Sequence, residues 1–338
     1  MNNLCIIGNE KIFLNNNYFY SANVDFKTIT QGLIKSFNVK LIARRSNKDE
    51  NFKLNLKKVL LSSSIIEFVI YVFCETLKSK KTKFLIISIT PYTFCAYLIL
   101  ALFSCDIYLY LRSDGFKEYE YILGKKWKFL YKIMFFFFIK KSKIISCYKG
   151  LYDGKIHQML QPSELDKKWF TQRKIIAPKK NIKLLYVGRI RVEKGIFNFL
   201  NLFNKLNNNF LLTVVGDKKI ELSNNKIKFF YFFRNTTNLI RQYDNCHIFV
   251  LPSYTEAHPK VIDEALSRIR PVIVFRDIKH VAKDRFGVFV VDRDLNQFNK
   301  KINYINKNYK KICKTIYANV LPKKKDFLLN FVSAIKRG

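Results

Sequence analysis

Two glutamates lie on either side of the start of a predicted helix in the second half of the chain. Residues 248–275 read IFVLPSYTEAHPKVIDEALSRIRPVIVF, an apolar strand followed by a polar loop and a helical pattern. Glu256 falls in the loop, Pro259 suits the first residue of the helix, and Glu264 lies about two turns into it. At roughly 8–12 Å apart, the carboxylates cannot share a proton or a metal ion but can hold two hydroxyl groups of one long ligand. The spacing leaves open that Glu256 only complements the helix dipole and that Glu264 is a solvated surface residue.

A pair of cations follows an earlier apolar strand. Residues 182–195 read IKLLYVGRIRVEKG. Gly188 allows a tight turn after the strand, and the N-terminus of the helix that opens at Gly195 favours an anion. Arg189 and Lys194 would add two fixed positive charges, which suit a diphosphate because Arg can bind two oxygens while Lys acts as a point charge. In a chain this basic, a chance pairing of cations stays open as the alternative.

The elements that must position these residues alternate along the chain. Apolar runs and helix-like stretches alternate twice, on either side of a polar segment with Gly and Pro at 149–181. Such alternation is typical of parallel sheets covered by helices on both faces, which bind ligands at the carboxyl edge of the strands. The sequence predicts an α/β protein with two doubly wound Rossmann-like domains facing a cleft, residues 1–160 and 161–320. A helix at 321–338 is expected to pack back toward the first domain.

The motifs of the second half occur together in one known family. Residues 182–275 resemble the nucleotide-sugar-binding domain of the retaining family 4 (group 1) glycosyltransferases of GT-B fold. That family shows G-R-x-x-x-x-K-G, a strand ending in Val-x-Gly, and P-S-x-x-E-x-x-P-x-x-x-x-E-A, in this order. The matching residues are Gly188, Arg189, Lys194, Gly195, Val214, Gly216, Pro252, Ser253, Glu256, Pro259, Glu264 and Ala265.

The resemblance implies a role for each matching residue. Arg189 and Lys194 would neutralise the leaving nucleoside diphosphate, Glu256 would contact the donor sugar, and Glu264 would hold the ribose hydroxyls. No metal or other cofactor is expected, because the two cations would stabilise the charge that grows on the leaving phosphate. The implied donor site comprises Gly188, Arg189, Lys194, Gly216, Glu256, Ala257, His258, Pro259, Lys260, Val261 and Glu264.

Three residues depart from the family pattern. Ala257 stands where Gly is common, His258 where apolar or aromatic residues are usual, and Arg270 where Gly often precedes Pro271. These differences bear on the identity of the donor sugar more than on the fold. His258 is expected either to touch the donor or to cap the helix.

The first half should supply the acceptor site. A predicted strand at 107–111 is followed by RSDG, which places Asp114 at the carboxyl edge of the sheet. Asp114 is the candidate that assists the acceptor hydroxyl, and with Glu256, Arg189 and Lys194 it completes the predicted catalytic set. The alternative is an Asp-Gly pair that only forms a turn.

The excess positive charge of the chain suggests a polyanionic partner. Lys and Arg number 61 against 25 Asp and Glu, a net charge of +36, and both halves are basic. Nucleic acid, an anionic membrane and a phosphorylated substrate all fit this charge. Residues 124–143, which overlap a helix predicted over 119–140, combine aromatic residues with lysines and favour contact with an anionic membrane surface. The alternative is a core helix whose lysines reach out to solvent.

The resemblance, together with these patterns, implies a retaining, metal-independent glycosyltransferase. It would move a sugar from a nucleotide-sugar donor to a glycan or lipid-linked acceptor in cell-surface polysaccharide or lipopolysaccharide synthesis. The N-terminus reads as a strand rather than a signal peptide, so we expect a cytoplasmic protein on the inner face of the membrane. The alternatives are a GT-B-like nucleotide-sugar epimerase and a basic nucleic-acid-binding protein. No nucleic-acid-binding module is recognisable, so no specific nucleic acid is expected as a partner.

Overall fold

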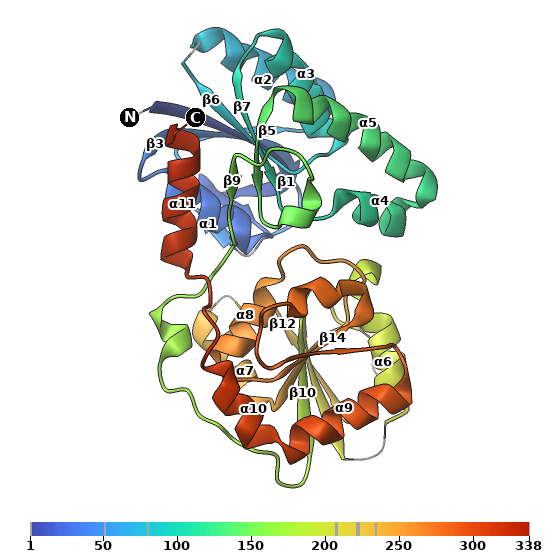
Figure 1. Ribbon diagram of the computed structural model, residues 1–338. Coiled ribbons are helices and arrows are strands. Elements are labelled where there is room, and N and C mark those ends of the chain that lie inside the picture. Colours follow the sequence, from blue (N-terminus) through green and yellow to red (C-terminus); the bar gives the residue numbers. More distant parts are fainter. Residues whose placement is uncertain are drawn as a thin grey trace. The chain divides into compact units, whose positions relative to one another are not determined.

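The chain folds into two compact units. The computed structural model describes residues 2–50, 52–79, 81–206, 209–220, 224–233 and 235–337. Unit 1 contains the chain up to Glu164 together with the segment from Lys324, and unit 2 contains Leu165–Lys323. Each unit has its own sheet of mainly parallel strands with helices packed against it, so the predicted doubly wound α/β class is confirmed (Figure 1).

The sheet of unit 1 is parallel along its main path. Its strands are β1 (Asn2–Asn15), β2 (Tyr18–Ser21), β3 (Phe37–Ser46), β4 (Phe52–Leu54), β5 (Lys58–Ser62), β6 (Lys83–Ile87), β7 (Asp106–Leu111), β8 (Ser142–Ser146) and β9 (Gln158–Met159). The parallel order is β5-β3-β1-β6-β7-β8-β9, and the antiparallel β2 and β4 extend from the C-terminal part of β1. The central strands are continuous apolar runs; in β7, every residue from Ile107 to Leu111 is buried, as expected for strands covered on both faces.

Local sequence fixes where the helices of unit 1 begin. They are α1 (Val24–Leu33), α2 (Ile65–Lys78), α3 (Pro91–Leu102), α4 (Gly115–Leu123), α5 (Lys125–Lys141) and α11 (Lys324–Arg337). At α2, Ser64 Oγ accepts a hydrogen bond from the backbone N–H of Glu67 at 3.1 Å. At α3, Thr90 and Thr93 form a reciprocal capping box and Pro91 is the first helical residue.

The predicted single helix over 119–140 is wrong. The chain instead forms α4 and α5, which are separated at Gly124. Gly124 has φ of 98°, a left-handed conformation that Gly adopts without steric penalty, and its N–H donates to the carbonyl of Glu120 to end α4. The aromatic pattern runs through this residue, so periodicity alone did not reveal the break.

The C-terminal helix α11 belongs to unit 1, where it lies beside α1 (Figure 1). Phe331 is fully buried, and its ring packs edge-on against Tyr110 of β7 with the centroids 5.0 Å apart. Near the end of the helix, the carbonyl oxygen of Ile335 accepts a hydrogen bond from Lys83 Nζ at 2.6 Å. The last residues of the chain therefore complete the core of the first unit.

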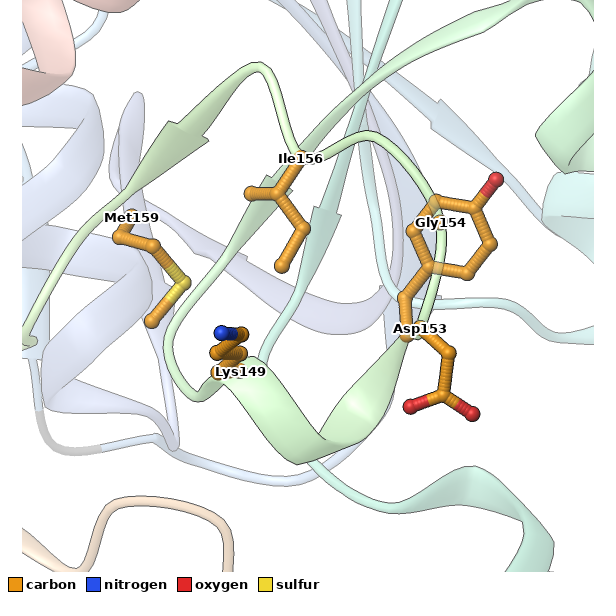
Figure 2. Close-up of a pocket in the computed structure, with 6 residues that line it drawn as sticks. Lys149, Asp153, Gly154, Ile156 and Met159 are labelled. Carbon is orange, nitrogen blue, oxygen red and sulfur yellow. The ribbon is translucent and has the colours of Figure 1, made fainter.

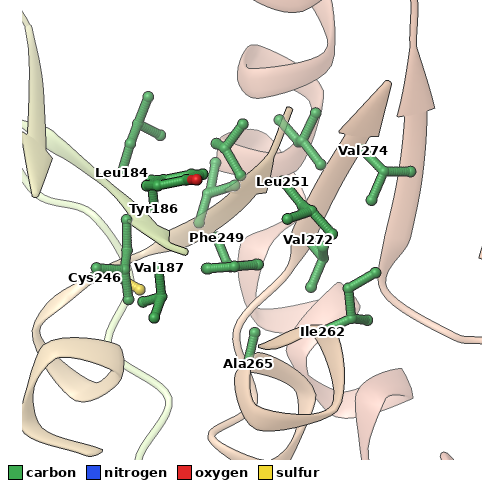
Figure 3. Packing of buried hydrophobic residues seen from close by; sticks show 14 of the residues in the cluster. Leu184, Tyr186, Val187, Cys246, Phe249, Leu251, Ile262, Ala265, Val272 and Val274 are labelled. Carbon is green, nitrogen blue, oxygen red and sulfur yellow. The ribbon is translucent and has the colours of Figure 1, made fainter. Parts of the chain in front are cut away.

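The sheet of unit 2 is parallel throughout the described strands. These are β10 (Ile182–Val187), β11 (Phe210–Gly216), β12 (Ile227–Tyr231), β13 (Ile248–Leu251), β14 (Val272–Phe275) and β15 (Val288–Val291). Its helices are α6 (Ile196–Asn204), α7 (Thr236–Asn245), α8 (Lys260–Ser267), α9 (Leu295–Lys307) and α10 (Tyr309–Ile316). Figure 3 shows part of the core, where Leu184 and Tyr186 of β10 and Leu251 of β13 lie among the apolar residues of α8 and β14.

The strand order of unit 2 creates a point where the chain changes direction across the sheet. The order is β12-β11-β10-β13-β14-β15, so the connection after β10 runs to one side and β13 lies on the other. After β10 the chain continues toward β11, and after β13 it continues toward β14, on the opposite side of the sheet. In open α/β sheets ligands bind at such a switch point. Gly188 follows β10 directly, and Pro252 follows β13 directly.

Removing the buried ring of α11 should destabilise unit 1. For Phe331→Ala we expect a loss of about 3–5 kcal/mol in the free energy of unfolding, because a fully buried aromatic side chain leaves a cavity. Leu329→Ala on the same helix is the matched control, since Leu329 is 57% exposed, and it should change stability by less than about 0.5 kcal/mol. Urea unfolding followed by circular dichroism measures both; equal losses would contradict the assignment of α11 to the core.

Candidate functional site

The loop after β10 is fixed by hydrogen bonds to its own strand and to β11. The Tyr186 hydroxyl donates to the carbonyl oxygen of Arg189 at 2.8 Å, and burial raises the pKa of Tyr186 well above its ordinary value, so the phenol stays a donor. The backbone N–H that follows Arg189 donates to Asp217 Oδ1 at 2.7 Å. At Gly216 a methyl group would lie 3.4 Å from the Gly188 carbonyl oxygen, so the ends of β10 and β11 approach closely.

The end of this loop touches the end of β13. Gly195 has φ of 64°, and a methyl group there would lie 1.9 Å from the carbonyl oxygen of Pro252. The same carbonyl accepts a hydrogen bond from Arg293 Nη2 at 2.8 Å, and the Arg293 guanidinium lies 3.9 Å from the centre of the Tyr254 ring. The two loops at the switch point are therefore locked together, and only Gly fits at position 195.

Glu256 is held in place by a cation and a hydroxyl group. Its Oε1 lies 2.7 Å from Lys194 Nζ and accepts a hydrogen bond from Ser253 Oγ at 2.7 Å. The ion pair is mostly buried, with 18% of the Lys194 side chain and 12% of the Glu256 side chain exposed. No described residue hydrogen-bonds to the second carboxylate oxygen of Glu256, which leaves it available to a ligand hydroxyl.

Glu264 is buried on α8 rather than solvated, which excludes the surface alternative. It is 7% exposed, and its Oε2 accepts a hydrogen bond from the Tyr243 hydroxyl at 2.8 Å. Burial, followed by the nearby Glu264 charge, raises the pKa of Tyr243 well above its ordinary value, so this hydroxyl remains a donor. Glu256 and Glu264 share none of these partners, in keeping with two carboxylates that hold separate groups.

The two predicted diphosphate ligands differ in their surroundings. Lys194, at the end of a 3₁₀ turn (Val192–Lys194), is committed to Glu256. Arg189 is exposed, and its guanidinium forms no ion pair with any residue of the described ranges. Arg189 is therefore the cation that is open to an incoming anion in this state of the protein.

The other predicted donor residues surround the start of α8. The helix begins at Lys260, one position later than predicted from the sequence, and Pro259 is its N-cap. Val261 packs partly buried against the core. Ala257 is buried. The N-cap makes no side-chain hydrogen bond, so the expectation that His258 caps the helix is wrong: His258 Nε2 lies 2.9 Å from Asp263 Oδ2 instead.

Arg270 has a structural role at the base of unit 2. It is fully buried, and its guanidinium donates to the carbonyl oxygens of Tyr243, Lys174 and Asp244 at 2.8, 3.1 and 3.0 Å. Arg268 holds the neighbouring carbonyls of Trp169 and Thr171 in the same way. The departure at position 270 therefore fixes the segment that enters unit 2 and makes no contact with the predicted donor residues.

Sequence reasoning missed three residues that shape the switch point. Asp217 follows the Val-x-Gly strand end directly, and this position could have suggested it. Tyr254 lies inside the recognised motif, and its N–H donates to the carbonyl of Glu193 at 2.9 Å. Arg293 lies 41 residues beyond Pro252, so only the fold reveals their contact.

Asp114 lies in unit 1, after β7. Its Oδ1 accepts a hydrogen bond from the backbone N–H of Lys117 at 3.2 Å, which makes it the N-cap of α4, and its Oδ2 lies 3.8 Å from Lys117 Nζ. Asp114 therefore has the local backbone role that the turn-forming alternative expected. Neither contact tests whether Asp114 also assists the acceptor hydroxyl.

A shallow cavity of about 300 Å³ lies elsewhere in unit 1 (Figure 2). It is lined by residues of the segment that follows β8 and of β9, namely Lys149, Tyr152, Asp153, Gly154, Ile156 and Met159. None of the predicted site residues belongs to it. Within the described ranges, no group of His, Cys, Asp and Glu has the arrangement of a metal site. No helix of those ranges has the length and apolar character needed to cross a membrane.

Comparison with known proteins gives a family match for most of unit 2. Residues 167–320 match the family model of glycosyl transferases group 1, and this segment contains every residue of the predicted donor site. Among curated proteins, the chain is 32% identical to an uncharacterized HTH-type transcriptional regulator of Pseudoalteromonas carrageenovora over 71 residues. That match covers 19% of this chain and 43% of the relative's length, and it shows no family.

Solved structures share the fold of the whole chain at low identity. Sucrose-phosphate synthase from Thermosynechococcus elongatus aligns with a TM-score of 0.71 at 13% identity, covering 100% of this chain and 99% of the other. Anabaena Alr3699/HepE in complex with UDP and glucose aligns with a TM-score of 0.70 at 10% identity, covering 99% and 100%. UDP-GlcNAc 2-epimerase from Neisseria meningitidis aligns with a TM-score of 0.56 at 12% identity, covering 100% of both chains.

The two doubly wound units and the site at the switch point of unit 2 define an α/β protein of GT-B fold. The match of unit 2 to the family model is more specific than the fold. Residues 167–320 are similar to the group 1 glycosyltransferases, a class of enzymes that transfer a sugar from a nucleotide-sugar donor.

The contact of Gly195 with Pro252 can be tested against a second Gly of positive φ. Gly195→Ala should lower the free energy of unfolding by at least about 3 kcal/mol, because the methyl group would collide with a backbone carbonyl in addition to the strain of φ. Gly124→Ala is the control: its φ is 98°, but no atom lies within 4 Å of the added methyl group, so about 1 kcal/mol of strain is expected. Denaturant unfolding compares the two, and similar losses would show that the two loops are not in firm contact.

Proposed function

We propose that this protein is a retaining, metal-independent glycosyltransferase that binds its nucleotide-sugar donor at the switch point of unit 2. The observation that carries the proposal is the pair of separately held glutamates at the start of α8, inside the segment that matches the family. Glu256 offers a free carboxylate oxygen for a hydroxyl of the donor sugar, and Glu264 lies buried beside Tyr243 for the ribose hydroxyls.

The leaving diphosphate would be neutralised by Arg189 and Lys194. Because Arg189 forms no ion pair with a described residue, it can bind the phosphates first. Lys194 would then turn from Glu256 toward the phosphate, which frees the carboxylate for the sugar. Fixed cations stabilise the charge that develops on the leaving group without rearrangement of solvent, so the reaction as proposed needs no metal ion.

Unit 1 is proposed to bind the acceptor. Asp114, which lies just after the end of β7, would assist the acceptor hydroxyl. Its Oδ1 meanwhile accepts the hydrogen bond that caps α4. The resemblance to enzymes that act on lipid-linked glycans favours a glycan or lipid-linked acceptor in the synthesis of cell-surface polysaccharide or lipopolysaccharide.

The surface of unit 1 supports contact with an anionic membrane on its cytoplasmic side. Large apolar side chains are exposed on three helices that pack together: Ile66, Ile70, Phe73 and Leu77 on α2, Leu98 and Leu102 on α3, and Trp127, Phe129, Ile133, Phe136 and Phe137 on α5. Lys125, Lys126, Lys132 and Lys140 are exposed on the same α5. Apolar patches with basic surroundings fit the headgroup region of an anionic bilayer, where each Lys contributes about 1 kcal/mol.

An epimerase of the same fold is the second candidate, favoured by the structural match to the Neisseria meningitidis enzyme. Incubating UDP-, GDP- and ADP-sugars with the protein in the absence of acceptor separates the two functions. A new epimer by NMR would support the epimerase and overturn the transferase proposal.

Donor binding depends on Glu264 and Lys194 if the proposal holds. By calorimetry with a panel of nucleoside diphosphates, starting with UDP, Glu264→Ala and Lys194→Met should each weaken binding roughly 10- to 100-fold, because each removes a charged hydrogen-bond partner. Lys205→Met is the control, since Lys205 is exposed at the far end of the helix that begins at the site, and it should leave the affinity unchanged. Unchanged affinity in Glu264→Ala would refute the assigned donor site.

Membrane contact is tested by flotation with vesicles. The protein should float with vesicles of phosphatidylglycerol and phosphatidylcholine but not with phosphatidylcholine alone. Lys132→Gln should weaken binding about 5-fold, the equivalent of about 1 kcal/mol, and Phe136→Glu should abolish it. Leu329→Glu, an equally exposed apolar residue on α11, is the control. If Phe136→Glu floats like the unmodified protein, this surface does not contact the bilayer.

A further inference from the structure

A buried cluster of His258, Asp263 and Arg285 begins two residues after Glu256. His258 Nε2 lies 2.9 Å from Asp263 Oδ2, and Arg285 Nη2 lies 2.9 Å from Asp263 Oδ1. The exposed fractions of the three side chains are 9%, 2% and 16%. Asp263 lies in the first turn of α8, and Arg285 comes from the segment just before β15. One carboxylate thus joins the donor loop to a distant part of unit 2.

Stability alone does not account for the histidine in this cluster. A buried carboxylate needs a partner of opposite charge, and Arg285 already supplies one. An apolar replacement of a buried ionic group is often neutral or stabilising. The N-cap of α8 makes no side-chain hydrogen bond, so His258 does not serve the helix either.

The hydrogen bond to Asp263 determines which nitrogen of the His258 ring remains available to accept a hydrogen bond. A carboxylate only accepts, so Nε2 carries the proton, and in the neutral ring Nδ1 is left as an acceptor. No residue of the described ranges bonds to His258 Nδ1, and Arg285 Nη1 is buried without a hydrogen-bond partner in those ranges. The cluster therefore has unfilled hydrogen-bonding positions close to the donor loop.

We infer that His258 Nδ1 accepts a hydrogen bond from a hydroxyl group of the donor sugar, and that Asp263 and Arg285 are positioning residues that hold the imidazole ring for this contact. The inference rests on the proposed function, which places the sugar at Glu256. The Cα atoms of residues 256 and 258 are at most about 7 Å apart, so both side chains can reach one hexose. The donor class is a nucleotide sugar with a free hydroxyl at the position of His258, and a deoxy sugar lacking that group would be bound less well.

The test separates the sugar from the nucleotide. Calorimetry on the full chain gives the ratio of Kd for UDP to Kd for UDP-glucose, with the GDP and ADP pairs measured in parallel. His258→Phe, which keeps an aromatic ring but removes its nitrogens, and Asp263→Asn should each weaken binding of the nucleotide sugar about 10-fold. The Kd for the nucleoside diphosphate should stay unchanged, so the ratio should fall about 10-fold. Arg276→Gln is the matched control, because it breaks the exposed ion pair with Asp292 in the same unit and should leave the ratio unaltered.

Deoxy analogues identify the sugar hydroxyl that donates a hydrogen bond to His258. Among UDP-glucose analogues that each lack one hydroxyl, one should bind about 10-fold more weakly than UDP-glucose to the unmodified protein. His258→Phe should bind this analogue and UDP-glucose equally. Imidazole nitrogen NMR should show the His258 Nδ1 resonance shifting with UDP-glucose but not with UDP.

The outcomes distinguish the inference from the proposed function. If the unmodified protein binds nucleoside diphosphates but the ratio is the same in His258→Phe, the inference is overturned and the donor site stands. If the unmodified protein binds no nucleoside diphosphate at all, the proposed function fails, and the inference with it. Circular dichroism confirms that each variant is folded. The isosteric Asp263→Asn and the shorter, uncharged Arg285→Gln each test the positioning of the His258 ring independently.

Discussion

The close approach of Gly195 to the carbonyl of Pro252 is the contact on which the proposed site depends. It brings the loop after β10 against the end of β13, so that Lys194 and Ser253 meet on one oxygen of Glu256. Arg293 Nη2 donates a hydrogen bond to the same carbonyl. With a Cβ at position 195 the two loops would separate, and the Glu256 carboxylate would lose Lys194 while keeping Ser253 on its own loop.

The excess positive charge has several separate uses in the described structure. Arg268 and Arg270 are buried and satisfy backbone carbonyls of the segment that enters unit 2. Arg285 neutralises Asp263. Buried cations of this kind work through hydrogen bonds at short range, and they say nothing about a polyanionic partner. Arg189, Lys194 and the exposed lysines of α5 are the cations that bear on what the protein is proposed to bind.

Much of the fold was predictable because the parallel strands are continuous apolar runs bounded by Gly, Pro and polar residues. The short strands β2, β4, β5 and β9 and the break at Gly124 were not, because they depend on pairing partners and on one backbone angle. In the site, Glu256, Glu264, Arg189 and Lys194 were selected by spacing and resemblance. Arg293 and Arg285 were missed, since both reach the site from segments far along the chain.

The sequence by itself determined the fold class and which residues belong to the donor motif, because these follow from periodicity and from spacing along a single segment. Only the tertiary structure decided that Glu256 is paired and Glu264 buried, that Arg270 is structural, and that His258 turns to Asp263 rather than to the helix end. The physical reason is that burial and hydrogen-bond partners are set by residues brought together from distant segments, which no local pattern encodes.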